Sequence, residues 1–159
     1  MDFKSLKDLE KYLQQQVNKS LERDVTPVVK DIMIELIEDT VYSAYSPSEY
    51  KRRRQDEGLA DPENIGGVMV GNTLEIINAT AANPDIYIHG VKYESINADD
   101  YLTPIIEYGQ GYEFHSDDGN LGYERPRPFI SNTREQLKST KAHVTALKNG
   151  LKKNGINVE

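Results

Sequence analysis

The stretch that decides the fold is Arg125-Pro-Arg-Pro-Phe-Ile130, which opens the last long helix that the sequence predicts. From about Pro128 onward, apolar and small side chains recur every three or four residues, which is the spacing of one helical face. They are Ile130, Thr133, Leu137, Thr140, Val144, Leu147 and Leu151. We therefore predict a single C-terminal helix over residues 125–153.

The N-terminal region, residues 1–45, carries the same helical spacing. Its apolar positions are Phe3, Leu6, Leu9, Leu13, Val17 and Leu21, then Val29, Ile32, Met33, Leu36, Ile37 and Val41. Pro27 interrupts the pattern, and Thr26 can cap a helix whose first residue is that proline. The pattern therefore predicts either two helices or one kinked helix, which ends before Ser46-Pro47 because the residue before a proline disfavours helix.

The centre of the chain predicts strands. Residues 46–67 form a polar connector that we expect to be mobile and that ends in Gly66-Gly67. Val68–Val70 and Leu74–Ile77 then predict a hairpin around Gly71-Asn72, a pair suited to a tight turn. Ile86–Tyr93 predicts one or two further strands.

A short helix completes the central region, 68–109, and a loop comes after it. Thr103-Pro104 repeats the cap pattern and predicts a short helix through Tyr108, which Gly109 ends. Residues 110–124 are rich in glycine and acids and predict a loop. The order of elements favours a single α+β domain over 1–159, in which a small, mostly antiparallel sheet packs against long N-terminal and C-terminal helices.

Charge is distributed unevenly along the chain. The net charge is −7, but residues 125–153 hold eight lysines or arginines against one acid, and the remainder is strongly acidic. This polarity would let the acidic body of one subunit meet the basic tail of a neighbour, although a solvated basic face is the simpler interpretation. The net negative charge disfavours strong general binding to duplex DNA.

The composition also restricts compartment and chemistry. Cysteine is absent, so no disulfide or thiolate metal site is possible. The charged N-terminus and the lack of a long apolar run predict a protein without membrane association, made in the cytoplasm.

No catalytic or metal-binding pattern in the sequence is complete. His115-Ser-Asp-Asp118 beside Glu113 lacks full calcium-loop spacing, so a solvated acidic loop is the better interpretation. The common nuclease core fails because Gly90 stands where an acid should precede Lys92. We expect no enzymatic activity, no cofactor and no metal.

An aromatic and basic block covers Tyr42, Tyr45, Tyr50 and the run Arg52–Arg54. Aromatic rings beside arginines can stack bases and hold phosphates. Packing of Tyr42 and Tyr45 at the end of the helix is the favoured alternative. For the arginines, contact with a neighbouring subunit and plain solvation both remain open.

Four blocks together resemble a known family. They are Tyr42-x-x-Tyr-x-Pro-x-x-Tyr-x-Arg52, Gly58-Leu59, Ile106-Glu-Tyr-Gly109 and Arg127-Pro-Phe-Ile130. In this order they are similar to the head–tail joining (tail-completion) proteins of long-tailed bacteriophages. That family's pattern has threonine-glycine-leucine after the first arginine, where this chain has Arg53-Arg54 and a longer connector.

The resemblance implies a small α+β virion subunit, assembled in the bacterial host cytoplasm into a ring, often of six copies. Its expected partners are copies of itself, the capsid connector and the tail proteins, with DNA only as passing cargo. We expect Glu107 and Tyr108 to position the glycine-rich loop, and Arg125 and Arg127 to make charge-assisted contacts within the subunit or to the next one. The full set of predicted contact residues is Arg52, Arg53, Arg54, Glu107, Tyr108, Arg125, Arg127 and Phe129. The alternatives are a nucleic-acid-binding phage regulator, a tail terminator and a minor capsid protein.

Overall fold

The computed structural model describes residues 3–44, 46, 52–81, 85–88, 91–94, 101–109 and 125–158. The fold is α+β, as the sequence predicts. The helical elements are α1 (Leu6–Ser20), η1 (Leu21–Val25), α2 (Thr26–Ile37), η2 (Glu38–Tyr42), η3 (Pro62–Asn64), α3 (Leu102–Tyr108), α4 (Phe129–Thr140) and α5 (Ala142–Lys153). The strands are β1 (Ile65–Val70), β2 (Thr73–Asn78), β3 (Asp85–Ile88) and β4 (Val91–Glu94).

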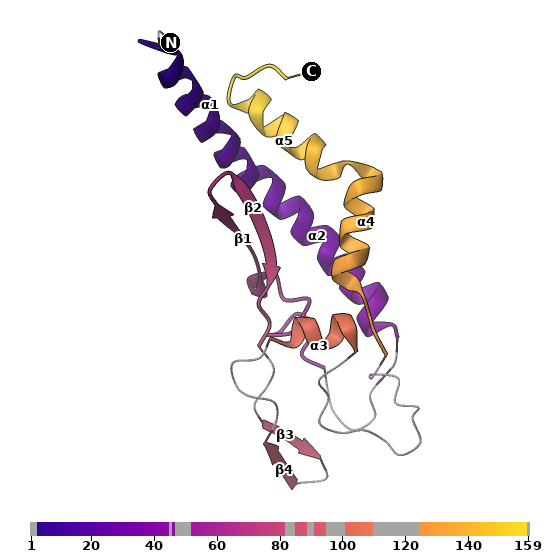
Figure 1. Ribbon diagram of the computed structural model, residues 1–159. Helices are drawn as coiled ribbons and strands as arrows, with labels where there is room; N and C mark the ends of the chain where they lie inside the picture. The colour runs from indigo at the N-terminus through magenta and orange to yellow at the C-terminus, as the bar shows by residue number, and fades with distance from the viewer. Residues whose placement is uncertain are drawn as a thin grey trace.

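The N-terminal elements form one long helix, in which α1, η1, α2 and η2 follow one another without a break (Figure 1). Thr26 is not an N-cap, in contrast to the sequence prediction. Its N–H reaches back five residues to the carbonyl of Leu21, and its hydroxyl donates to the same oxygen at 3.3 Å. Pro27 has no N–H to continue the usual α pattern, and the wider π turn of η1 absorbs that loss. The kinked continuation is therefore the correct alternative.

The core lies along one side of α2. Residues four apart in this helix are buried, from Val29 at 7 % exposure to Ile37 at 0 %. The central cluster contains Met33, Ile37, Val41, Tyr42, Leu59, Ala60, Ile65, Ile106 and Phe129. It therefore joins the long helix to the connector, to the first strand and to both α3 and α4.

The predicted hairpin is confirmed. Strands β1 and β2 pair antiparallel around Gly71-Asn72, and Gly71 adopts a φ of +62° that suits glycine. Strand β1, however, begins at Ile65, so Gly66 and Gly67 belong to the sheet and not to the connector. A Cβ on Gly67 would lie 2.6 Å from Oγ1 of Thr26, so glycine is what allows the strand to approach the long helix.

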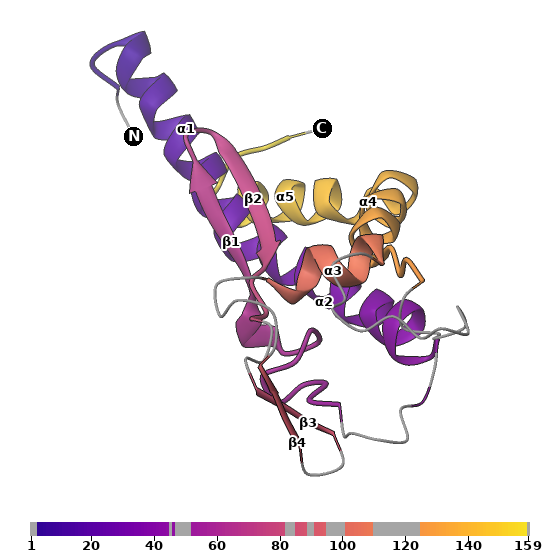
Figure 2. The same ribbon diagram turned by 60° about the horizontal axis from the view of Figure 1, so that its bottom comes forward.

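The strands form two separate antiparallel pairs. Strands β3 and β4 pair with each other from Asp85↔Glu94 to Ile88↔Val91, which confirms the strands predicted over Ile86–Tyr93. The hairpin β1–β2 packs on the long helix, whereas α4 and α5 lie along a different side of it (Figures 1 and 2).

The C-terminal region is two helices and not the single helix predicted over 125–153. Lys141 takes a left-handed conformation with φ 55° and separates α4 from α5. The break changes the direction of the chain, so that α4 packs against α2 and α5 packs against η1 and α1 (Figure 1). Thr140, placed on the apolar stripe by its spacing, is exposed, and its hydroxyl accepts a hydrogen bond from the Ala142 N–H at 3.3 Å.

The described part of the predicted connector packs onto the folded body. Leu59 and Ala60 are buried in the core, at 2 % and 0 % exposure. The Leu59 carbonyl accepts a hydrogen bond of 2.7 Å from the side-chain amide of Asn78 in β2. A Cβ on Gly58 would meet the backbone of Arg54 at 2.8 Å or less, so the turn also needs glycine at this position.

Candidate functional site

Glu107 caps helix α4 from a distant part of the chain. Helix α4 begins after Pro128, whose side chain cannot accept a hydrogen bond, so the first N–H groups of the helix need another partner. The Glu107 carboxylate accepts from the N–H of Ile130 at 2.8 Å, and from the N–H and hydroxyl of Ser131 at 3.0 and 2.6 Å. A carboxylate also complements the positive end of the helix dipole. This contact fixes α4 to α3.

Arg127 and Phe129 lie inside the subunit on either side of Pro128. Phe129 is completely buried in the central cluster, and Arg127 is 4 % exposed. The Arg127 N–H donates to the carbonyl of Ile106 at 3.0 Å, which ties the chain before α4 to α3. Glu107, Arg127 and Phe129 were predicted as subunit or partner contacts. All three are buried in the folded subunit, so their contacts lie within one subunit.

Tyr42 organises the basic run that comes after the long helix. Its ring is buried, and the guanidinium carbons of Arg52 and Arg54 lie 5.4 and 5.2 Å from the ring centroid, within cation–π range. Arg52 also donates to the Tyr42 carbonyl at 2.7 Å. Burial raises the pKa of the Tyr42 hydroxyl. Packing of Tyr42 is therefore the correct alternative, and its ring is not available to stack a base.

The remaining predicted arginines and tyrosine reach the surface to different degrees. Arg54 pairs with Glu38 at 3.3 Å, and its side chain is 56 % exposed. Arg53 donates to the Ala81 carbonyl at 2.9 Å. Tyr108 is 63 % exposed and Arg125 is also exposed. Of the predicted contact residues, Tyr108, Arg125 and Arg54 are thus the most available to a partner.

The four blocks of the resemblance converge in space. Each contributes one buried side chain to the same central cluster: Tyr42, Leu59, Ile106 and Phe129. Segments up to 87 positions apart in the sequence are thereby joined around Ile37 of α2, which has no exposed surface. One residue of each motif therefore belongs to a common core.

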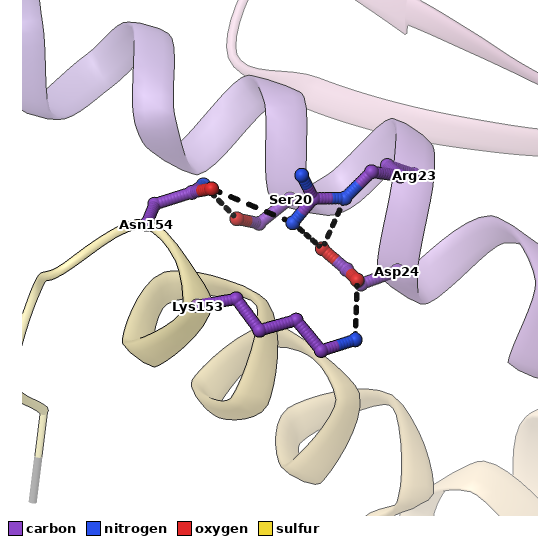
Figure 3. Close-up of polar contacts among 5 residues, drawn as sticks. All are labelled: Ser20, Arg23, Asp24, Lys153 and Asn154. Atoms are coloured by element: carbon purple, nitrogen blue, oxygen red, sulfur yellow. Dashed lines mark hydrogen bonds and ion pairs between the residues drawn. The ribbon is translucent and has the colours of Figure 1, made fainter.

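A second polar cluster, whose residues form no pattern in the sequence, joins η1 to the end of α5 (Figure 3). Asp24, only 10 % exposed, accepts from Arg23 at 2.8 Å and from Lys153 at 3.3 Å. The side-chain amide of Asn154 donates to the Ser20 hydroxyl at 3.2 Å. Both Ser20 and Gly150 are buried where the helices meet, so small residues bring the two backbones close together.

The described residues contain no group of three or more His, Cys, Asp or Glu side chains placed to hold a metal ion. Across the same ranges, no helix is long and apolar enough to cross a membrane. The acidic loop segment at 113–118, Tyr45, Tyr50, and Gly90 of the nuclease test lie outside the described residues.

Comparison with known proteins identifies the family. The YomN family model matches residues 5–153, which is most of the chain. The chain belongs to the YomN family. It is 31% identical over 162 residues to the SPbeta prophage-derived uncharacterized protein YomN of Bacillus subtilis (strain 168), covering 98% of this chain and 99% of that protein. No solved structure matches the chain. The relationship indicates a prophage protein.

In this YomN-family chain, the Asp24 cluster predicts sensitivity to acid. Hydrogen bonding from Arg23, with a further contribution from Lys153, holds the pKa of Asp24 below the usual value of an aspartate. A carboxylate with a lowered folded pKa stabilises the protein above its unfolded pKa, and this contribution is lost as the pH falls through the folded pKa. We expect Asp24→Asn to lower the melting temperature at about pH 6, with a smaller difference from wild type at about pH 2. Thermal melts followed by circular dichroism across this range test it, with the exposed Asp31→Asn as control. A difference that is the same at both pH values would contradict the assignment.

At Gly150, in the same interface, we expect the usual preference of helices for alanine over glycine to be reversed. A Cβ at this position would lie 2.8 Å from Cγ of Asp24 and 3.0 Å from Cβ of Ser20, so alanine displaces the Asp24 carboxylate from its partners. Glycine to alanine within a helix normally stabilises it by about 1 kcal/mol. Here we expect Gly150→Ala to destabilise the protein by about 2 kcal/mol, because overpacking outweighs that gain. Urea unfolding measures the change. Asn149→Ala, exposed on the same helix, should be neutral or stabilising, and a stabilising Gly150→Ala would show that α5 does not pack this closely.

Proposed function

We propose that this YomN-family chain is a structural subunit of the phage head–tail junction, where its copies form a ring between the capsid connector and the tail. The convergence of the four blocks in one core is the observation that supports this proposal most directly. Tyr42, Leu59, Ile106 and Phe129 all belong to the blocks that resemble head–tail joining proteins, and all four pack together. A shared set of core positions is what a shared fold requires.

The proposal also fits the setting and the chemistry. The SPbeta prophage relative is consistent with a role in a phage particle. The buried Glu107 carboxylate and the backbone N–H of Arg127 hold α4, and the chain just before it, against α3, which is a structural use. We therefore propose a non-enzymatic protein without a cofactor, located in the virion after assembly in the host cytoplasm.

The test is deletion of the gene from its prophage, followed by induction and electron microscopy of the lysate. We expect DNA-filled heads and separate tails of normal length, and complementation with the wild-type gene should restore infectious particles. Mass spectrometry of purified wild-type virions should detect the protein. Intact virions at normal titre after deletion would contradict a joining role, and tails of irregular length would indicate a tail terminator instead.

A nucleic-acid-binding regulator loses support from the geometry around Tyr42. A ring that stacks bases must be accessible, and this one is 8 % exposed with two arginines beside it. We expect little salt-dependent retention of the purified protein on DNA. Strong retention that falls steeply with salt would bring the regulator back as the leading function.

A further inference from the structure

We propose that an acidic ridge on α2–η2 of one copy docks against a basic ridge on α4 of the next copy. This inference rests on the proposed ring and names the surfaces that join its subunits. The acidic ridge consists of Asp31, Glu35 and Asp39, and the basic ridge consists of Arg134, Lys138 and Lys141. All six residues are exposed.

The acidic ridge lies opposite the buried side of its helix. Met33 and Ile37, two residues from its members, are at 3 % and 0 % exposure, so the ridge faces away from the core. Within the described part of the chain, none of its three carboxylates has an ion pair or side-chain hydrogen bond. Like charges four residues apart on a helix repel one another. The isolated subunit therefore carries an unfavourable arrangement that a cationic surface would relieve.

The basic ridge has matching dimensions. Its members are four and three residues apart and those of the acidic ridge are four apart, so successive charges on both ridges are separated by about one turn, ~4.5–6 Å along the helix axis. Lys138 pairs with Glu135 at 2.6 Å, but the two side chains are 69% and 71% exposed. An exposed ion pair contributes little stability, so Lys138 can leave Glu135 for another carboxylate at little cost. Although α2 and α4 pack together within the subunit, the described ion pairs do not join the two ridges of one copy.

Lys141 gives independent support to the basic ridge. It is a non-glycine residue at φ 55°, at the break between α4 and α5. Glycine is the residue that adopts this conformation at least cost. A lysine here costs stability in the isolated subunit, and the proposed contact supplies a use for its charge.

The two ridges are different surfaces, so a head-to-tail contact between them leaves one ridge free at each end and can close into a ring. Positive and negative patches of matched spacing fix the orientation and register of such a contact. The occupant of the acidic ridge is therefore a second copy of this chain.

Sedimentation velocity of the full chain tests the contact at ~0.01 M and ~1 M NaCl, where the screening length is ~30 and ~3 Å. We expect concentration-dependent species larger than a dimer at low salt, with the dissociation constant raised about tenfold or more at high salt, as three exposed ion pairs predict. A chain that stays monomeric at low salt at every concentration overturns the proposal, and one that stops at a dimer overturns the head-to-tail arrangement.

Charge-reversal variants identify the surfaces. Asp31→Lys with Glu35→Lys, and separately Arg134→Glu with Lys138→Glu, should each abolish self-association, whereas an equimolar mixture of the two variants should associate again. Lys4→Glu with Lys7→Glu changes the charge of exposed lysines near the start of α1 by the same amount and should associate as wild type. Circular dichroism confirms that each variant is folded. Association that survives reversal of either ridge, or a mixture that fails to associate, overturns the contact.

Lys141→Gly separates assembly from folding. We expect it to raise the melting temperature and to weaken self-association, whereas a purely structural role for Lys141 would leave association unchanged. The gene deletion reports on the joining function independently of these measurements. If virions are still joined after the gene is deleted, the proposed ring function is wrong, but the contact between the two ridges is not affected. If the deletion leaves heads and tails separate while the purified chain is monomeric, only the proposed contact is wrong.

Discussion

Replacing Phe129 with alanine is expected to lower the free energy of unfolding by about 4 kcal/mol, because the change removes a fully buried aromatic ring and leaves a cavity. Phe129 opens α4 and packs in the cluster that contains Tyr42, Leu59 and Ile106. The cavity would therefore lie where the four blocks meet. Urea unfolding followed by far-ultraviolet circular dichroism measures the loss.

Two control variants make this result specific. Phe129→Leu keeps most of the volume and should cost about 1 kcal/mol. Val68→Ala removes an apolar side chain that is 51 % exposed on β1, so it should change stability by about 0.5 kcal/mol or less. Equal effects of Phe129→Ala and Val68→Ala would contradict a core built around the shared blocks.

The parts of the fold that were predicted correctly depend on local signals. Gly71-Asn72 gave the position of the hairpin because the turn needs a positive φ, which Gly71 adopts at 62°. Gly109 ended α3 for the same reason, with a φ of 63°. The residues that determine these features are neighbours in the sequence, so the pattern of the sequence is enough to predict them.

The features that were missed depend on distant neighbours. Thr140 continues the spacing of the predicted helical face, and only the packing of α4 on α2 and of α5 on η1 explains why the chain turns at Lys141. Gly67 and Gly150 resemble flexible or weak positions in the sequence. In the structure each permits a close contact, with Thr26 and with Asp24 and Ser20 respectively.

The candidate site shows the same limit. The motifs drew attention to Glu107, Arg127 and Phe129 as subunit or partner contacts, and for Arg127 a contact within the subunit was one of the two alternatives. The burial of Glu107 and Arg127 was not predicted, because charged residues are usually exposed. A signal for the interior role of Glu107 was present: it comes directly after the apolar pair Ile105-Ile106, and α4 has no side-chain cap of its own. The Asp24 cluster had no comparable signal, because Asp24 and Lys153 are 129 positions apart.

Replacing Glu107 with alanine should destabilise the protein by about 3 kcal/mol, because the first N–H groups of α4 lose the charged acceptor that satisfies them. The carboxylate is 5 % exposed and receives hydrogen bonds from Ile130 and Ser131. We also expect hydrogen exchange at those two amides to accelerate more than exchange in the centre of α5. Urea unfolding and amide exchange measured on the same samples test both expectations.

Matched variants distinguish a helix cap from a general effect of charge. Glu107→Gln keeps the size and one acceptor oxygen, so it should cost about half as much as Glu107→Ala. Glu135→Ala removes the same kind of side chain from the exposed surface of α4, where its pair with Lys138 contributes about 0.5 kcal/mol or less. If Glu107→Ala and Glu135→Ala have equal effects, α4 is not fixed through its first turn. A large loss at Glu107 alone, with faster exchange at Ile130 and Ser131, would show that the Ile106–Gly109 block acts by setting the position of α4, and with it the position of the basic ridge.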